Sequence, residues 1–340
     1  MKTFGRYLLY RLENSALRTV VFTVISVIIA QTTVSDSIGM QEVQYNSTGI
    51  EVLAVILGIF CTLIPILETS CFKNRRNLDT LYFFPIKRWK MATVHFVSGF
   101  IQVLFIYSVA FFVAFGYLAA NTDYFALGYM PIYYLFSILL GLVMYSFFMF
   151  VFGQANTVAD GVVLCVLWMF VISLVMMVIR GEVMDAFVKD MKNIPDLSGW
   201  GIAYAPINNL TVIFQDLIEI NKQTYGMTDY AARYLSQMYM FFVWGAVGIA
   251  TAVGYVVTFV KKGAEKAGEI SSSIFGYKLL IPVYGYSLLM MCGLIDYLTI
   301  LIFIAMVVGY IVYRRSFKLK TSDLVFTGCG VIAVILGSML

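Results

Sequence analysis

Long apolar runs separated by short charged segments dominate the pattern of this chain. Most of the runs reach the roughly 17 to 25 residues that a helix needs to cross about 30 Å of hydrocarbon. Runs such as 162–179, VVLCVLWMFVISLVMMVI, are apolar on every face, whereas the strands of a membrane barrel alternate polar and apolar residues. The pattern predicts an all-α, polytopic integral membrane helical bundle with about eight to nine transmembrane helices, expected near 19–35, 51–67, 92–119, 131–152, 161–179, 238–260, 278–293, 296–313 and 323–340.

Composition supports the membrane class. The chain is 61% hydrophobic and 12% charged, whereas about a quarter of the residues of a soluble domain are charged. The first apolar run follows eighteen residues that contain Arg6, Arg11 and Arg18 and lacks a small-residue cleavage site, so we expect a retained helix and not a signal peptide. The five cysteines form no CxxC pair, and the sequence therefore suggests neither a disulfide framework nor a zinc site.

The distribution of basic residues predicts the orientation of the chain. Short loops rich in Lys and Arg stay in the cytoplasm. Of the 23 Lys and Arg residues, 18 fall on one predicted side: four before the first run, six in 68–90, four in 261–278 and four in 314–320. The other five all lie in the long segment 180–237, which is placed outside. The N-terminus is therefore expected in the cytoplasm, although the loop 153–160, expected on the same side, has no basic residue.

The outer segment 180–237 is the only long stretch expected not to cross the membrane. Pro, Gly and Asn are frequent in its middle part and are typical of turns. Residues 210–220, LTVIFQDLIEI, could form a short amphipathic helix. An ordered cap on the membrane surface and a gate over a substrate cavity both fit this pattern.

The cytoplasmic segment 72–90, FKNRRNLDTLYFFPIKRWK, has an amphipathic pattern. On a helix Leu78, Leu81 and Tyr82 share one stripe, Arg75 and Arg76 lie around it, and Pro85 ends the turn. Such a ridge fits an acidic lipid surface or a groove in a cytoplasmic protein. A simpler explanation of these basic residues is that Lys and Arg commonly flank membrane spans on the cytoplasmic side.

A resemblance favours the protein groove. Residues 68–101 resemble the segment that joins the second and third spans of ABC-2 type permeases, the membrane subunits of ABC exporters. In that family an acidic residue closes the second span, and arginine, a leucine-rich turn and a Pro-Ile-x-Arg element follow. The resemblance implies that 68–90 is the coupling segment that docks into an ATPase subunit. The residues it implicates, with Arg76 and Tyr82 added from the amphipathic pattern, are Glu68, Arg75, Arg76, Leu78, Leu81, Tyr82, Pro85, Ile86 and Arg88.

Two further segments are similar to a Gram-positive bacterial subgroup of these permeases. Residues 259–280 resemble its RKAE-x-AGE cytoplasmic segment. Residues 313–324 resemble the basic segment that leads into a later transmembrane helix of the subgroup. The resemblance implies a six-helix transmembrane domain in 1–260, followed in 261–340 by a cytoplasmic connector and additional transmembrane helices. Members of the subgroup usually continue well beyond this length, so a truncated chain and a naturally shorter form are the two interpretations of the end at Leu340.

The resemblance also defines the expected partners. No GxxxxGK[ST] loop occurs in the 340 residues, so ATP would be bound by a separate subunit and no cofactor is expected in this chain. We expect cytoplasmic ABC ATPase subunits, a second permease subunit and membrane lipid as partners, and no nucleic acid. The expected location is the plasma membrane of a bacterium, and the expected cargo is an amphipathic or apolar molecule, or force passed to a partner.

Two rival classes remain from the residues alone. An ion-coupled transporter normally carries ionisable groups near the midplane, whereas the cores of the predicted spans hold almost none. The charged residues Glu51, Glu68, Asp160, Arg180, Asp296 and Asp323 all fall at predicted span ends. The single histidine, His95, lies four residues into the third run, where an interfacial position is favoured over a proton relay. A membrane sensor or scaffold without transport is the other alternative. With one histidine and no paired carboxylates in the spans, no catalytic or metal-binding residue is assigned.

Overall fold

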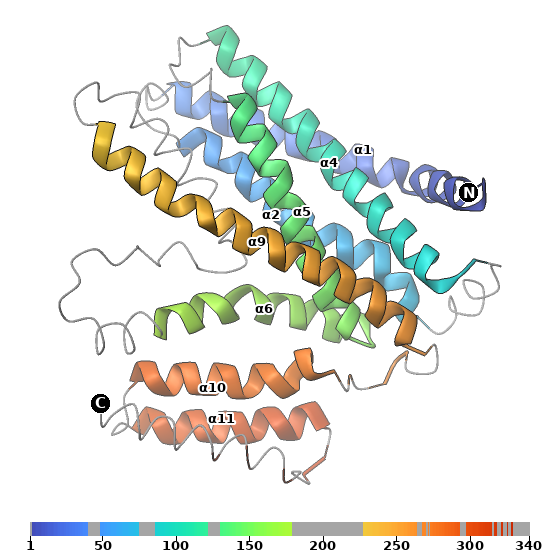
Figure 1. Ribbon diagram of the computed structural model, residues 1–340, viewed down its shortest axis with the longest axis vertical. Coiled ribbons are helices and arrows are strands. Elements are labelled where there is room, and N and C mark those ends of the chain that lie inside the picture. Colours follow the sequence, from blue (N-terminus) through green and yellow to red (C-terminus); the bar gives the residue numbers. More distant parts are fainter. Residues whose placement is uncertain are drawn as a thin grey trace. The chain divides into compact units, whose positions relative to one another are not determined.

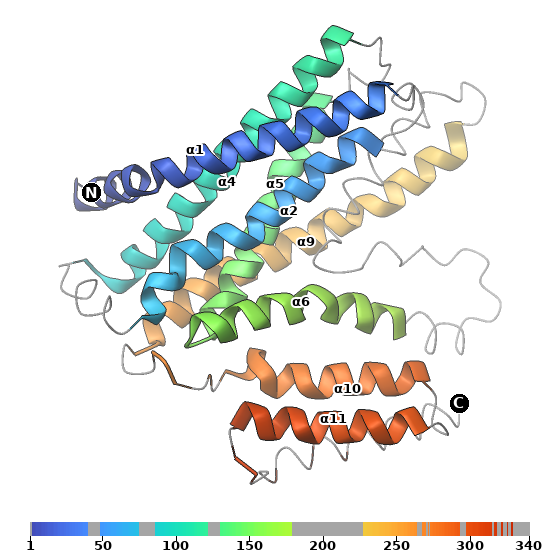
Figure 2. The same cartoon turned by 180° about the vertical axis from the view of Figure 1, so that it is seen from behind.

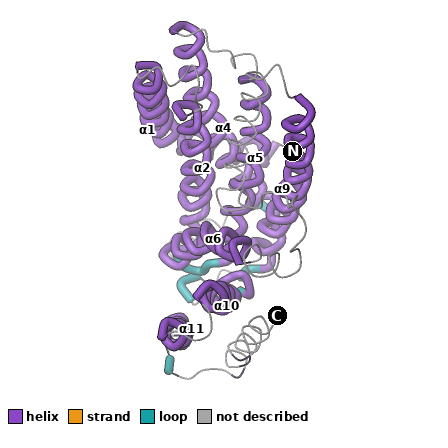
Figure 3. Tube along the Cα trace, turned by 90° about the vertical axis from the view of Figure 1, so that its left-hand side faces the viewer, coloured by secondary structure: helices purple, strands orange, loops and turns teal. Residues whose placement is uncertain are grey.

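Helices form all the regular structure of the part of the chain that the computed structural model describes, and Figure 3 shows no strand there. The helices fall into two compact units, each described by itself below. The structure describes residues 2–39, 48–74, 86–121, 130–178, 227–263, 267–269, 271, 273–292, 297–314, 316, 317, 321, 325 and 328.

Five long helices form unit 1, which comprises Met1–Gly153 and Pro206–Glu265 (Figure 1). Each of the five is long and apolar enough to cross a membrane. The predicted all-helical chain with several membrane-crossing helices is therefore confirmed for the described residues. The helices are α1 (Lys2–Gly39), α2 (Thr48–Thr69), α4 (Arg88–Asn121), α5 (Met130–Gln154) and α9 (Met227–Lys261), and a 3₁₀ turn, η2 (Ser70–Lys73), follows α2.

Two helix ends differ from the prediction. Helix α1 begins at Lys2 and not near residue 19, and α9 begins at Met227, inside the predicted outer segment 180–237. Hydropathy marks where apolar residues begin, whereas a helix continues as long as its backbone bonds do, and neither 2–18 nor 227–237 contains a proline. Helix α1, with 38 residues, is about 57 Å long and exceeds the hydrocarbon thickness. The possible helix 210–220 lies outside the described residues.

Helix α4 is the centre of unit 1. It packs against α1, α2 and α9, and Figure 2 shows α1, α2 and α4 side by side. Aromatic rings fill its contact with α5, where the Phe111 and Tyr134 ring centroids lie 4.9 Å apart. The Ser108 and Tyr134 hydroxyls are hydrogen-bonded there at 2.7 Å. At one end of the unit, the Ser35 and Tyr117 hydroxyls, 3.2 Å apart, join the C-terminal turns of α1 and α4.

Small residues bring α9 close to α5. A Cβ added at Gly248 would lie 2.8 Å from Cγ2 of Val143, and one added at Gly254 would lie 3.0 Å from the ring of Phe150. Close helix approach at small residues is the usual packing mode in membranes, because water-driven burial is absent there. These two glycines therefore serve a contact within the chain.

The other ends of the unit 1 helices meet at the C-terminus of α5. The Lys73 ammonium donates to the Phe152 carbonyl at 2.7 Å, and the Lys262 ammonium donates to the Gly153 carbonyl at 2.9 Å. The last carbonyls of a helix lack partners within the helix, and they attract cations. The two lysines therefore place the ends of α2, α5 and α9 together, although the loop after α5 has no basic residue of its own.

Unit 2 comprises Gln154–Ala205 and Lys266–Leu340. Its helices α6 (Val158–Val178), α10 (Leu279–Cys292) and α11 (Tyr297–Arg314) are apolar, and a π-helical turn, η7 (Ile274–Lys278), precedes α10. The Gly268 amide, in a residue with φ of 83°, donates to the Asn156 carbonyl at 3.0 Å. The connector that follows α9 thus lies against the loop that precedes α6. The predicted division of the chain near residue 260 stays a prediction.

Candidate functional site

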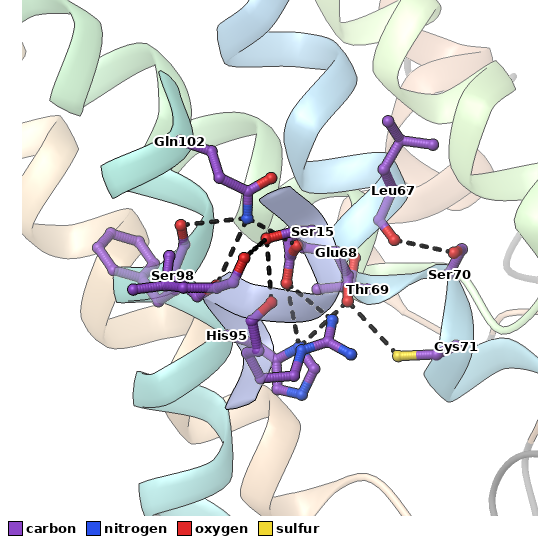
Figure 4. Close-up of polar contacts among 12 residues, drawn as sticks. Ser15, Leu67, Glu68, Thr69, Ser70, Cys71, His95, Ser98 and Gln102 are labelled. Carbon is purple, nitrogen blue, oxygen red and sulfur yellow. Dashed lines mark hydrogen bonds and ion pairs between the residues drawn. The ribbon is translucent and has the colours of Figure 1, made fainter. Parts of the chain in front are cut away.

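A buried carboxylate joins three helices of unit 1. Glu68 occupies the last turn of α2, and its side chain is 0% exposed. The Arg11 guanidinium donates to Oε2 of Glu68 at 2.8 Å, and the Gln102 amide donates to Oε1 at 2.9 Å. The Arg18 guanidinium also donates to Oε1 of Glu68 and, at 2.8 Å, to the Gln102 side-chain oxygen. Figure 4 shows Glu68 between Gln102 and His95.

Heptad spacing places the partners of Glu68. Arg11 and Arg18 are seven residues apart on α1, and His95 and Gln102 are seven apart on α4. Residues at this spacing lie on one face of a helix. Each pair therefore faces the C-terminal end of α2 from one side of its own helix. No loop residue is needed to position the partners of Glu68.

His95 is fully buried, and both of its ring nitrogens have partners. Nδ1 lies 3.1 Å from the Glu68 carbonyl oxygen, and Nε2 lies 3.1 Å from the Tyr7 hydroxyl. A neutral ring that donates from Nδ1 to the carbonyl and accepts the Tyr7 proton at Nε2 satisfies both contacts. The histidine thus links α1, α2 and α4 at the base of the cluster.

A fourth helix, α5, contributes Tyr145, which packs against α4 next to the Glu68 cluster. Its hydroxyl donates to the Phe96 carbonyl at 3.0 Å, and its ring packs edge-to-face on the Phe96 ring, with the centroids 5.2 Å apart. A Cβ added at Gly99 would meet the Tyr145 hydroxyl and lie 3.1 Å from Cγ of Glu68. Only a residue without a side chain fits at Gly99, because α4 passes between the carboxylate and the tyrosine there.

The cluster lies one hydrocarbon thickness from the opposite helix ends. Arg18 is 18 residues from Asp36 at the far end of the α1 span, which is about 27 Å along a helix. Gln102 is 19 residues from Asn121, where α4 ends. If one face of a 30 Å hydrocarbon layer lies at these far ends, its opposite face therefore lies at the level of the cluster. With the layer placed in this way, the charges lie at its boundary and not at its midplane.

The charges of the cluster do not balance. Two guanidinium groups share one carboxylate, which leaves one excess positive charge while His95 is neutral. A buried carboxylate with two cationic donors and an amide is well satisfied, and such a network is suited to fixing three helices relative to one another. Among the described residues, no group of three or more His, Cys, Asp or Glu side chains could hold a metal ion.

The structure describes three of the residues that the resemblance implicates. Ile86 is half-buried and packs against Tyr7, Met91 and Val94. Glu68 is turned into unit 1, where it cannot contact another subunit directly. Arg88 is exposed and begins α4. The other predicted residues lie outside the described part of the chain, and their roles stay predictions: Arg75, Arg76, Leu78, Leu81, Tyr82 and Pro85.

Sequence reasoning missed the partners of Glu68. In the sequence, Arg11 and Arg18 were interpreted only as basic residues that precede the first span. The signal that could have found them is the repeat itself, since two polar pairs with heptad spacing on neighbouring helices indicate a shared polar contact. For His95, burial and two satisfied nitrogens favour a structural role, and its predicted interfacial position stays a prediction.

No protein-family model and no curated protein matches this chain. The fold and the site together define a multi-pass helical membrane protein with a buried charged cluster at one end of its helices.

Proposed function

We propose that this chain is the permease subunit of an ATP-binding cassette exporter of the ABC-2 type, with about eight to nine transmembrane helices and its N-terminus in the cytoplasm of a bacterium. ATP would be hydrolysed by separate subunits that bind the coupling segment 68–90, and a second permease subunit would complete the transporter. The cargo would be an amphipathic or apolar molecule. Alternatively, the subunit would pass force to a partner.

The observation that carries the proposal is the position of Glu68. The resemblance to ABC-2 permeases assigns this acidic residue to the start of the coupling segment, and in the structure it is bonded to Arg11 and Arg18 on α1 and to Gln102 on α4. A displacement of the segment that follows Glu68 would therefore act on three helices at once, because a well-satisfied buried network transmits force without first breaking. This is the connection that an externally driven permease requires.

Copurification tests the proposal. The tagged chain is purified from its native membrane in mild detergent, and the bound proteins are identified by mass spectrometry. We expect an ATPase with a P-loop, and its loss in the double variant Arg75→Glu with Leu78→Glu. Arg6→Glu is the matched control, because it reverses one exposed charge outside the coupling segment. Recovery of the chain without an ATPase, or equal recovery with the double variant, would contradict the proposal.

A second candidate, an ion-coupled transporter, has one observation in its favour. The Tyr7 hydroxyl bonds to His95, and Nδ1 of His95 lies 3.6 Å from Oε2 of Glu68; buried protonatable groups in such a chain can carry protons in transporters. This candidate predicts that His95→Ala and the collapse of the proton gradient both abolish transport. An ATP-driven permease would keep transport after the gradient is collapsed. Transport measured in vesicles with an added protonophore therefore separates the two candidates.

A further inference from the structure

The excess charge of the cluster faces outward. The side chains of Arg11 and Arg18 are 20% and 27% exposed, whereas Glu68 between them is 0% exposed. The Nε atoms of both arginines are buried and, among the described residues, have no hydrogen-bond partner. Each guanidinium carries five N–H donors in a planar fork. The partly exposed remainder of each side chain can therefore meet an anion that approaches α1 from outside the bundle.

An apolar line continues from the arginines along α1. Ile25 and Ile29 follow Arg18 by seven and eleven residues, so they lie on the same edge of the helix. They are 45% and 44% exposed. Arg18 to Ile29 spans about 16 Å along the axis, which is close to half of a 30 Å hydrocarbon layer.

Two cationic groups at the boundary, followed by an apolar line one leaflet deep, match a lipid and not a small ion. A free phosphate would use the guanidinium groups alone, and a protein helix would cover the apolar line without needing the charge. An anionic phospholipid uses both features, because its phosphate offers charge and acceptor oxygens and its acyl chain lies parallel to the helix.

We propose that Arg11 and Arg18 bind the phosphate of an anionic phospholipid whose acyl chain lies along Ile25 and Ile29. The site is independent of the proposed exporter function, because it requires neither an ATPase nor a cargo. The bound phosphate neutralises the excess charge of the Glu68 cluster and holds α1 at the membrane boundary.

The test measures lipid that stays bound. The full chain is incorporated into nanodiscs of equal parts phosphatidylglycerol and phosphatidylcholine, extracted in detergent and washed in 1 M KCl, where the Debye length is about 3 Å and diffuse attraction is screened. Mass spectrometry of the extracted lipid then gives phosphatidylglycerol per chain. We expect enrichment of phosphatidylglycerol over phosphatidylcholine, and about a fivefold loss of it in Arg11→Gln, the factor that corresponds to about 1 kcal/mol per basic residue.

The variants separate binding from folding. Arg11→Gln leaves Glu68 bonded to Arg18 and Gln102, so the cluster stays satisfied. Arg6→Gln removes the same charge from an exposed position of the same helix and should lose less than twofold. Leu17→Glu places an anion beside Arg18 without breaking a hydrogen bond and should also abolish the enrichment, which keeps the proposal testable should Arg11→Gln fold poorly.

Three results would overturn the proposal. Equal phosphatidylglycerol and phosphatidylcholine on the wild-type chain would show that no anionic lipid is selected. Equal losses in Arg11→Gln and Arg6→Gln would show surface attraction only. Displacement of the lipid by 10 mM inorganic phosphate would show a small-anion site in which the Ile25 and Ile29 line takes no part.

Discussion

Removal of the Glu68 charge should destabilise unit 1 more than removal of any exposed acid. In Glu68→Gln the shape of the side chain is kept, but Arg11 and Arg18 then share no anion. Breaking a buried ion pair by removal of one partner costs roughly 3 to 5 kcal/mol. Because the Arg11 and Arg18 side chains are 20% and 27% exposed and can shift toward water, we expect the lower end, about 3 kcal/mol.

Thermal unfolding in detergent, followed by size-exclusion chromatography, measures this loss. For a domain of 150 to 250 residues, each kcal/mol shifts Tm by roughly 2 to 4 °C, so we expect a decrease of about 6 to 12 °C. Glu13→Gln, which removes an exposed acid of α1, is the matched control and should shift Tm by less than about 2 °C.

A compensating variant separates lost charge pairing from general damage. Replacement of a whole buried ion network by neutral residues is often neutral in stability. The triple variant Glu68→Gln, Arg11→Gln, Arg18→Met should therefore regain at least half of the lost Tm. A Glu68→Gln protein as stable as the wild type, or a triple variant less stable than Glu68→Gln, would refute the reasoning from the unpaired charges.

Helix packing and chain orientation give further expectations. Gly99→Ala places a methyl group against the Tyr145 hydroxyl and should cost about 1 to 3 kcal/mol in the same unfolding assay; Gly116→Ala, with no atom within 4 Å, should be neutral or stabilising. In a background without native cysteines, a membrane-impermeant maleimide should label Asn121→Cys in intact cells and Phe317→Cys only after permeabilisation. The opposite labelling pattern would reverse the proposed orientation.

The predicted helices were close to those of the structure where apolar residues define them. The expected runs 92–119 and 131–152 correspond to α4 and α5 within a few residues. Helix ends beyond the apolar runs were missed at α1 and α9, because polar residues also continue a helix. The residues of the coupling segment could be identified only through a resemblance, and Glu68 is the fully buried one of the three that the structure describes.

The amino-acid sequence by itself determined the class of the protein. Apolar runs of about twenty residues must form helices in lipid, because no water is present there to satisfy the backbone. Which polar residues meet was decided by the tertiary structure alone. Glu68 lies 57 residues from Arg11 and 34 from Gln102 along the chain, and nothing local pairs them. They come together because a buried charge needs partners, and the packing of α1 and α4 against α2 supplies them.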